Sequence, residues 1–340
     1  MESAKVVLQS NRLAPATVRT RSAQLRAWDE FSQSMDVTAV PPSPDEVTSY
    51  ASWLMLTKCS RETSLRQYLS ALKTHFNQQN LWIPSPREYG PLGAVVDGAK
   101  RLFPGAIRRS LPVSVPLLHN LVSSPPPPGA DPRRKLLLQI LKDTVTLLFF
   151  TMLRASSLFP ASLAEADPLR NLSWDRVKFT EFGAVIFVLY SKTNQFHQRV
   201  HRVVLKEKTG SIFCPVQAMK RLRDMRGVPA HLLHDHVFQI PTRAGGWSLL
   251  TKPTVNKWFR GRIEAMGLPR DRYLLHGFRH GAVSLALVEE PNLNMVKIQS
   301  DHLSDSVWSY AQVDVNRRLS VASKMVDALD NYRPVAGGHH

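Results

Sequence analysis

The chain carries its most informative stretch at residues 275–282, which read Leu275-His276-Gly277-Phe278-Arg279-His280-Gly281-Ala282. The apolar pattern after this stretch predicts a helix over Gly277–Glu289. His276 and Arg279 are three residues apart and so share one face at the start of that helix. An imidazole and a bidentate guanidinium at this spacing can hold one anion between them. An ordinary hydrogen-bonded surface pair has the same spacing and remains the alternative.

A zinc site on His276 and His280 is a weaker interpretation of the same stretch. The two histidines are four residues apart, as in metalloproteases of the His-Glu-x-x-His type. However, Gly277 stands where those enzymes need their general base. The sequence therefore predicts neither a metal nor a cofactor.

Four further residues stand in a fixed order around this stretch. Arg154 ends an apolar helix, and Lys192 lies at the tip of a predicted hairpin; both precede it. His302 follows His276 by 26 residues, and Tyr310 follows His302 by eight. With its order Arg, Lys, His-x-x-Arg, His, Tyr, the chain resembles the tyrosine recombinases, or phage-integrase family. The resemblance covers about 111–329. The residues of the central stretch are more similar to recombinases of eukaryotic mobile elements of the Crypton or DIRS type than to typical bacterial resolvases.

The resemblance implies a mainly α fold that closes as a C-shaped clamp around DNA. It places an N-terminal helical core-binding domain, of the SAM-like kind, at residues 1–107. An α+β catalytic domain with a small antiparallel sheet follows at 108–330, and residues 331–340 form a tail. At 340 residues, the chain is long enough for two such domains, each with its own core.

The resemblance also implies a role for each of these residues. Tyr310 is the expected nucleophile and gives a 3′-phosphotyrosyl enzyme, whereas Arg154 and Arg279 neutralise the charge on the nonbridging oxygens. Lys192 is the expected general acid for the leaving 5′-oxygen. His276 acts as a base or orienting partner, and His302 bonds a nonbridging oxygen. The covalent bond conserves the phosphodiester energy, so that rejoining needs neither ATP nor metal.

Structural interpretations of the same residues stay open. Arg154 could be a cation at a helix C-terminus, Lys192 a solvated hairpin lysine, and His302 a helix cap. The rivals of Tyr310 are Tyr273, which precedes the histidine–arginine stretch, and Tyr332, which lies in the tail; neither fits the order.

The sequence departs from the common family pattern in two places. The gap from the second histidine to the tyrosine is usually nine residues and here is eight. Either the connecting turn is one residue shorter, or Asp301 replaces a basic residue and His302 replaces the tryptophan of some mobile-element members. The acidic residue expected three positions after Arg154 is Ser157, so another group must support that arginine.

Charge and composition favour a nucleic-acid partner. The chain has 44 Lys and Arg against 27 Asp and Glu, a net charge of +17. Residues 1–107 carry 12 basic and 9 acidic residues, and residues 108–340 carry 32 and 18, so the C-terminal part holds most of the charge. Neutralised phosphates release counterions, which drives binding to such a surface. Two cysteines 155 residues apart exclude a disulfide framework and favour a reducing compartment, which is the nucleus for a eukaryotic host and otherwise the cytoplasm.

Helical patterns with basic faces occupy the first hundred residues. They cover Thr17–Gln33 and Ser64–Gln79, and a capping box at Ser43-Pro44-Asp45-Glu46 opens a helix between them. The glycine- and proline-rich stretch Gly90–Pro112 predicts a basic linker at the domain boundary. The expected DNA-binding residues of this part and the linker are Arg19, Arg21, Arg26, Arg66, Lys73, Arg101, Arg108 and Arg109.

The second part is predicted to be mostly helical with a small sheet. Leu136–Leu153 is apolar but contains Gln139, Lys142 and Asp143, which indicates a buried helix and not a membrane span. Ala184–Tyr190 and Val200–Leu205 are predicted to pair as antiparallel strands. Further predicted helices are Val115–Val122, Pro215–Met225, Thr251–Met266, Leu293–Ile298, Ser304–Tyr310 and Arg317–Leu329.

These observations predict a site-specific DNA recombinase or integrase that acts on double-stranded DNA. A homodimer or homotetramer on paired sites is expected, with the helix near residues 313–329 docking either on a neighbouring copy or on its own domain. Two alternatives remain. One is a relative that nicks and reseals alone like type IB topoisomerases, or that forms hairpin ends. The other is a sequence-specific DNA-binding protein that has lost catalysis.

Overall fold

A computed structural model describes residues 15–103, 110–191, 194, 199–227, 234–290 and 292–302. The chain divides into two compact units, here called the N-terminal unit (Met1–Arg108) and the C-terminal unit (Arg109–His340). Tyr310, Lys192, Arg108 and Arg109 lie outside the described residues, as do the tail at 331–340 and the two helices predicted after residue 303.

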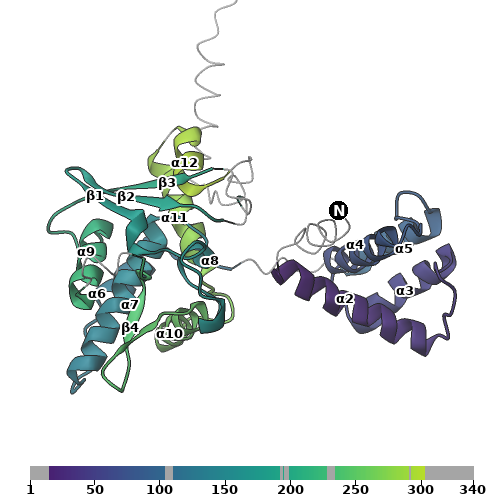
Figure 1. Cartoon of the computed structure of the whole chain (residues 1–340), viewed down its shortest axis with the longest axis horizontal. Coiled ribbons are helices and arrows are strands. Elements are labelled where there is room, and N and C mark those ends of the chain that lie inside the picture. Colours follow the sequence, from purple (N-terminus) through teal and green to yellow (C-terminus); the bar gives the residue numbers. More distant parts are fainter. Residues whose placement is uncertain are drawn as a thin grey trace, which may run out of the picture. The chain divides into compact units, whose positions relative to one another are not determined.

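The described part of the N-terminal unit is a bundle of helices α2 (Pro15–Ser34), α3 (Pro44–Thr57), α4 (Glu62–Gln78) and α5 (Gly90–Leu102) (Figure 1). The predicted capping box is confirmed: the Ser43 side chain accepts from Glu46 N, and the Glu46 carboxylate accepts from Ser43 N. Aromatic rings fill the centre, where Trp28 meets Tyr50 edge-on with 5.0 Å between ring centroids.

The predicted linker at Gly90–Pro112 is wrong over most of its length. Residues 90–102 form α5, whose Leu92, Val96 and Ala99 are buried in the same core as α3 and α4. Four-residue and three-residue spacing places these apolar side chains on one helix face. Packing against that core outweighs the low helix propensity of the three glycines of this segment.

Helix α7 (Pro132–Phe150) forms the centre of the C-terminal unit and packs against α6 (Val115–Ser123), α9 (Pro215–Arg226) and α11 (His276–Glu289). The side chain of Asp131 caps its N-terminus by accepting from Arg134 N. Asp143, although buried among the apolar residues of α7, accepts two hydrogen bonds from Arg221 Nε of α9 at 3.1 and 3.2 Å. The predicted buried helix is confirmed. Among the described residues, no helix is both long and apolar enough to cross a bilayer.

The small sheet contains three antiparallel strands in the order β1 (Val177–Thr180), β2 (Gly183–Val188), β3 (His201–Lys206). The predicted pairing of the second and third strands is confirmed, with Ile186 opposite Val203. Strand β1, which is only four residues long, was not predicted. Along β3 the side chains alternate between buried and exposed, as expected for a sheet with one face on the core.

Short elements complete the C-terminal unit around these layers. They are the helix α8 (Ala155–Leu158), the 3-10 turns η1 (Leu163–Glu165) and η2 (Trp174–Arg176), the hairpin of β4 (Gln239–Pro241) and β5 (Trp247–Leu249), and the helices α10 (Lys252–Ala265) and α12 (Leu293–Ser300). The hairpin was not predicted. The helices α6, α9, α10, α11 and α12 match their predicted positions to within a few residues.

The segment Ser110–Val113, which enters the C-terminal unit, lies directly on α11. Val113 N donates to the carbonyl of Gly277 at 2.9 Å. A Cβ atom on Gly277 would lie 2.4 Å from the carbonyl oxygen of Leu111, and one on Gly281 would lie 1.9 Å from that of Val113. Only glycine permits this contact between the two backbones.

Candidate active site

The start of α11 presents the first two candidate residues. His276 is its first residue and Arg279 lies one turn later, on the same face. Arg279 is 1% exposed and is the largest fully buried side chain among the described residues, whereas His276 reaches the surface. The N-terminal turn of a helix carries partial positive charge, so this end of α11 favours an anion even before the side chains are counted.

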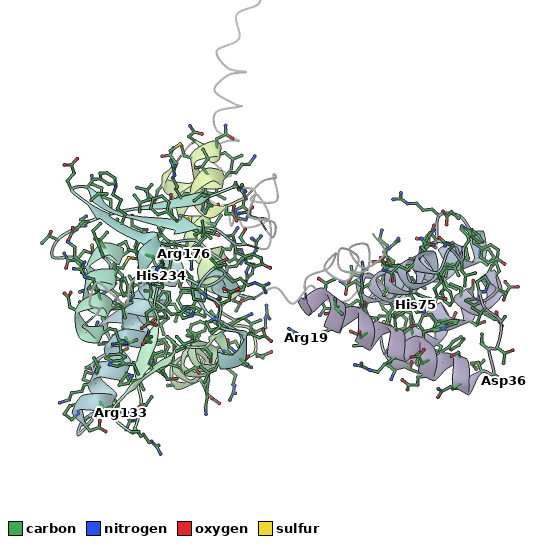
Figure 2. The ribbon with its side chains drawn as sticks, viewed as in Figure 1. Arg19, Asp36, His75, Arg133, Arg176 and His234 are labelled. Carbon is green, nitrogen blue, oxygen red and sulfur yellow. The ribbon has the colours of Figure 1, made fainter. Side chains whose placement is uncertain are left out.

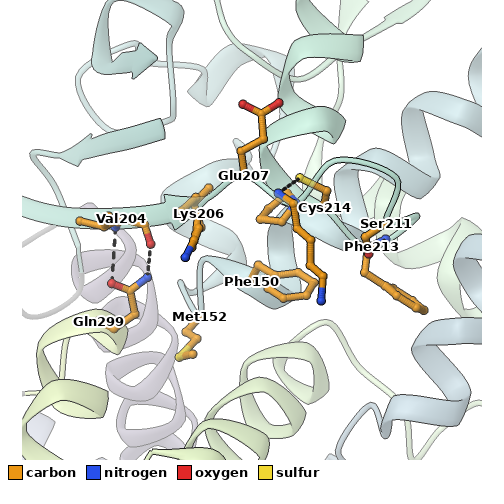
Figure 3. Close-up of a pocket in the computed structure, with 12 residues that line it drawn as sticks. Phe150, Met152, Val204, Lys206, Glu207, Ser211, Phe213, Cys214 and Gln299 are labelled. Carbon is orange, nitrogen blue, oxygen red and sulfur yellow. Dashed lines mark hydrogen bonds between the residues drawn. The ribbon is translucent and has the colours of Figure 1, made fainter. Parts of the chain in front are cut away.

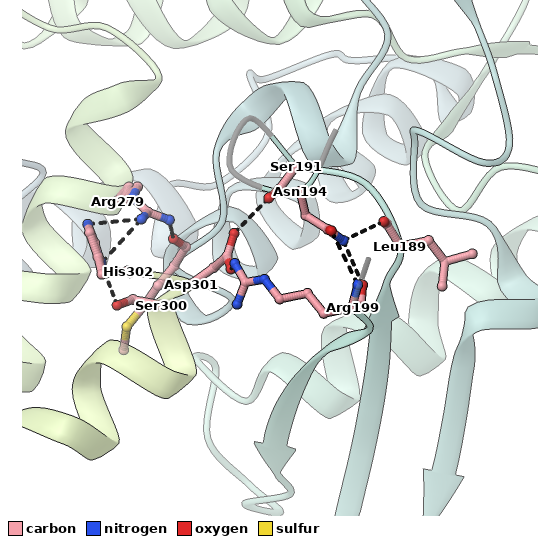
Figure 4. Close-up of polar contacts among 9 residues, drawn as sticks. Leu189, Ser191, Asn194, Arg199, Arg279, Ser300, Asp301 and His302 are labelled. Atoms are coloured by element: carbon pink, nitrogen blue, oxygen red, sulfur yellow. Dashed lines mark hydrogen bonds and ion pairs between the residues drawn. The ribbon is translucent and has the colours of Figure 1, made fainter. Parts of the chain in front are cut away.

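Two groups hold the Arg279 guanidinium in place (Figure 4). Its Nη1 donates to the carbonyl oxygen of Met152, just beyond the end of α7. Its Nη2 lies 3.0 Å from Nε2 of His302. Neither of these partners carries a negative charge, so they orient the guanidinium without neutralising it.

The hydrogen bonds of His302 determine how its ring is protonated. The Ser300 hydroxyl donates to the carbonyl of Val296 and lies 2.7 Å from Nδ1 of His302. Arg279 Nη2 also lies 3.2 Å from Nδ1, but the Ser300 contact is shorter and that hydroxyl proton is already used. We therefore assign the ring proton to Nδ1, as donor to Ser300, and leave Nε2 to accept from Arg279. In this arrangement His302 orients Arg279. Its bond to a nonbridging phosphate oxygen stays a prediction.

The pKa of His302 is lowered to about 3, first by burial of the ring and then by the positive charges of Arg279 and Arg154. His302 is 8% exposed, so water cannot compensate for a charge on its ring. The imidazole is therefore neutral at physiological pH, as its role as hydrogen-bond acceptor requires.

Arg154 reaches the site from a different element. It is the N-cap residue of α8, and its carbonyl accepts from Ser157 N at 2.8 Å. The chain turns into this position at Met152, whose φ of +53° is a left-handed conformation that costs a non-glycine residue about 1 kcal/mol. That turn also directs the Met152 carbonyl at Arg279. No hydrogen bond or ion pair joins the Arg154 side chain to another of the described residues.

The surroundings of His276 show how positive this site is. The pKa of His276 is lowered first by the partial desolvation of its ring, although the residue reaches the surface, and then by electrostatic interactions with Arg279, His280, Arg154 and Lys252. Lys252, the first residue of α10, was missed by the sequence analysis because a lone lysine after a turn carries no pattern. A site surrounded by cations attracts an oxyanion such as a phosphodiester. Within the described residues, no group of three or more metal-ligating side chains joins His276 and His280.

The structure thus brings together Arg154, His276, Arg279 and His302 from three separate places in the chain, which are the start of α8, the start of α11 and the end of α12. The nearest described neighbours of the two remaining candidates are Ser191, directly before Lys192, and His302, eight residues before Tyr310. The rival Tyr273 is partly buried and packs against the core of the C-terminal unit.

Two of the expected DNA-binding residues of the N-terminal unit are engaged in ion pairs. Arg66 pairs with Glu62 one turn earlier on α4, and Lys73 Nζ lies 2.7 Å from Glu88 Oε2. Both cations face a cleft of about 380 Å³, which Ser70 and Asn77 of the same helix also line. The face is therefore polar and basic, with part of its charge offset by carboxylates.

Among the described residues, four further expected DNA-binding arginines are exposed or half-buried. Arg19, near the start of α2, is exposed (Figure 2). Arg26 is also exposed, and Arg21 between them is half-buried. Arg101 is exposed in the last turn of α5. DNA contact by these residues stays a prediction.

Comparison with known protein families gives no matching family model, and no curated protein matches the chain. Solved structures do match. The integrase of the transposon Tn1549, in complex with transposon right end DNA, has a TM-score of 0.58 at 14% identity, covering 95% of this chain and 98% of that one.

Two other solved structures match similarly. The XerH site-specific recombinase, in a post-cleavage complex with palindromic difH substrate, has a TM-score of 0.60 at 14% identity, covering 95% of this chain and 84% of that one. A lambda integrase dimer bound to a COC′ core site has a TM-score of 0.56 at 14% identity, covering 92% and 97%. At this level of identity, the similarity shows a shared fold.

Proposed function

We propose that this chain, whose fold is that of the tyrosine recombinases and integrases, cuts and rejoins duplex DNA through a phosphotyrosine. One observation carries the proposal: two guanidiniums and two imidazoles, from three parts of the chain, meet at the positively charged start of α11. In particular, we propose a site-specific recombinase or integrase of a mobile element, of the Crypton or DIRS type. Such an enzyme needs this kind of phosphate-binding site.

In the proposed first step, the Tyr310 oxygen attacks the phosphorus of one phosphodiester. A bond forms between phosphorus and the tyrosine oxygen, and the bond from phosphorus to the 5′-oxygen breaks. Lys192 gives a proton to that leaving oxygen, and the tyrosine proton passes to a base, for which His276 is the proposed group. A 5′-hydroxyl of another strand reverses the step and releases Tyr310.

Arg154 and Arg279 stabilise the charge that accumulates on the nonbridging oxygens during this step. Arg279 is already oriented by Met152 and His302, so little reorganisation is needed when the phosphate arrives. Buried, pre-oriented donors of this kind contribute far more than solvated ones, because the site has a low dielectric constant. We assign to His302 the orientation of Arg279, with phosphate contact as its second role.

We further propose that the enzyme acts as a homodimer or homotetramer on paired sites, with residues 1–107 binding DNA and 108–330 catalysing. We propose that an apolar cavity of about 720 Å³ in the C-terminal unit receives apolar side chains of the helix predicted near residues 313–329 of a second copy (Figure 3). Phe150, Met152, Val204 and Phe213 line it, and Gln299, close to the end of the described chain, lies at its edge. For a eukaryotic host, we propose nuclear localisation.

Covalent trapping tests the proposed function. The protein is incubated in EDTA with nicked duplexes selected by binding from a random-sequence pool, and the products are separated on denaturing gels. A protein–DNA adduct is expected that is lost in Tyr310→Phe and kept in the matched variant Tyr273→Phe. Tight, salt-dependent DNA binding with no adduct contradicts the proposed enzyme function and supports the alternative of a DNA-binding protein that has lost catalysis. Relaxation of supercoiled DNA by a monomer instead supports a topoisomerase-like relative.

A further inference from the structure

Asp301 occupies an unusual position between the candidate site and the sheet. It is the C-cap of α12, and its φ of +56° is left-handed, a conformation in which glycine is the least strained residue. Its side chain is buried, at 3% exposed for the residue. An aspartate is costly in both respects, so its carboxylate must supply compensating interactions.

The Asp301 carboxylate makes two such interactions with the loop between β2 and β3 (Figure 4). Oδ2 accepts from Ser191 Oγ at 2.8 Å, and Oδ1 forms an ion pair with Arg199. These two residues flank the segment 192–198 on its two sides. A single carboxylate, more than a hundred residues away in the chain, thus binds both ends of this loop.

Asn194 reinforces the same arrangement from within the loop. Its side-chain amide donates to the carbonyls of Leu189 at 2.8 Å and Arg199 at 2.6 Å. These bonds draw the two ends of the loop together, so that Asp301 holds one connected unit.

Asp301 is also connected to the cluster that we propose binds phosphate, which consists of Arg154, His276, Arg279 and His302. The preceding Ser300 and the following His302 contact each other, and His302 contacts Arg279. Helix α12 is in turn fastened to the edge of β3, where Gln299 Nε2 donates to the Val204 carbonyl at 2.8 Å. The segment 299–302 therefore connects the sheet, the loop ends and Arg279.

We propose that Asp301 is a positioning residue: by fixing Ser191 and Arg199 relative to Arg279, it makes proton donation by Lys192, the residue after Ser191, efficient. This inference rests on the proposed function. Lys192 lies one peptide bond from a residue that Asp301 holds. Loss of the Asp301 bonds leaves phosphate binding by Arg154 and Arg279 intact and impairs only delivery of the proton to the 5′-oxygen.

The test compares two DNA substrates that differ in one atom. The first is the nicked duplex selected above, and the second carries sulfur in place of the 5′-bridging oxygen at the cleaved phosphate. A thiolate leaves without being protonated, so cleavage of the sulfur substrate needs no general acid. The measured quantity is the single-turnover rate of adduct formation on each substrate.

Two variants remove the proposed interactions in different ways. Asp301→Asn keeps the size and tolerates the left-handed backbone but loses the charge, and Asp301→Gly removes the side chain and suits the backbone. We expect adduct formation about 10²-fold slower on the oxygen substrate, as for loss of general-acid catalysis, and within about threefold of the unsubstituted protein on the sulfur substrate. Lys192→Ala removes the proposed proton donor itself. It therefore gives the largest recovery of the adduct-formation rate that the sulfur substrate can produce.

A matched control separates positioning from stability. Asp143→Asn breaks an equally buried pair of aspartate and arginine, between α7 and α9. It lowers the melting temperature but leaves the ratio of the two rates unchanged. If the Asp301 variants slow both substrates equally, or neither, the proposal is overturned although the proposed function stands. If the unsubstituted protein forms no adduct with either substrate, both fail.

Discussion

The cations of helix α4 and those at the start of α11, all expected to bind phosphate, lie in different environments. On α4, Arg66 and Lys73 are partly exposed and each is paired with a carboxylate. At α11, Arg279 is buried and is held by a backbone carbonyl and a neutral imidazole. Water surrounds the first pair of cations, and protein dipoles surround the second.

This difference separates affinity from catalysis. Exposed cations add a salt-dependent and geometry-tolerant contribution to DNA binding, because their charges are screened and their side chains move. A buried, pre-oriented guanidinium contributes little to finding DNA, yet it acts strongly on a phosphate that changes charge beside it. We therefore expect substitutions in the two helices to affect different measurements.

The largest effect is expected for Arg279→Lys. Lysine keeps the charge but cannot contact the Met152 carbonyl, His302 and a phosphate with one planar fork. Adduct formation should fall by about 10²- to 10³-fold, while the dissociation constant for duplex DNA changes by less than about threefold. Single-turnover rates and filter binding measure the two quantities. Arg66→Lys is the surface control, and an equal loss of rate in both variants would remove the distinction between the helices.

Acid should destabilise the C-terminal unit through His302. Its pKa is about 3 in the folded protein and about 6.5 in an unfolded chain, so between these values the unfolded state binds the extra proton. Stability therefore falls as pH decreases from 6.5 toward 3. At pH 5.5 the expected loss is about 1 kcal/mol from this residue.

Hydrogen exchange of the α7 and α11 amides at pH 7.5 and 5.5, corrected for intrinsic rates, measures this loss. His302→Gln should reduce the difference. A variant with the full pH dependence would show that other groups cause it. His201 and His236 have lowered pKa values in the same direction, mainly through burial, and account for part of the remainder.

The capping box gives a comparably small effect that is confined to the N-terminal unit. Ser43→Ala leaves the Glu46 N–H without its side-chain acceptor and should cost about 1 kcal/mol. Hydrogen exchange within α3 detects this change, and the same experiment on α11 serves as the internal reference. Altered exchange in α11 would mean that the two units do not unfold separately.

The smallest effect should be a gain. Glu62→Gln and Glu88→Gln remove the carboxylates that pair with Arg66 and Lys73, which leaves those cations free to contact phosphate. We expect DNA affinity to rise about two- to threefold in each variant, with a steeper dependence of the binding constant on salt. Unchanged affinity and salt dependence would show that this face of α4 does not contact DNA.

Sequence patterns located the long helices and the central strand pair, because apolar periodicity and capping residues are local signals. They failed where packing decides. Residues 90–102 were interpreted as a linker because of their glycines and proline, and only the shared core with α3 and α4 makes them a helix. Strand β1 has four residues, too few to show an alternation.

The candidate site was predictable to the extent that side chains act directly. Arg154, His276, Arg279 and His302 were selected by their order, and the structure places them together. The Met152 contact was not predictable, because the interacting atom is a backbone carbonyl that any residue could supply. Asp301 was noticed only as a departure from a pattern, since its partners are more than a hundred residues away.

The close contact of α11 with the segment Ser110–Val113 restricts which residues an evolutionary descendant of this chain can lose. Gly277 and Gly281 lie within the stretch that contains the candidate residues His276 and Arg279. What requires these two glycines is the close approach of two backbone carbonyl oxygens. A descendant that lost Arg154 or Tyr310 and kept only DNA binding would still be under selection to retain both glycines. In such a descendant the two glycines would report only that the protein still folds, whereas under the proposed function the two arginines and the tyrosine would report whether it still cuts DNA.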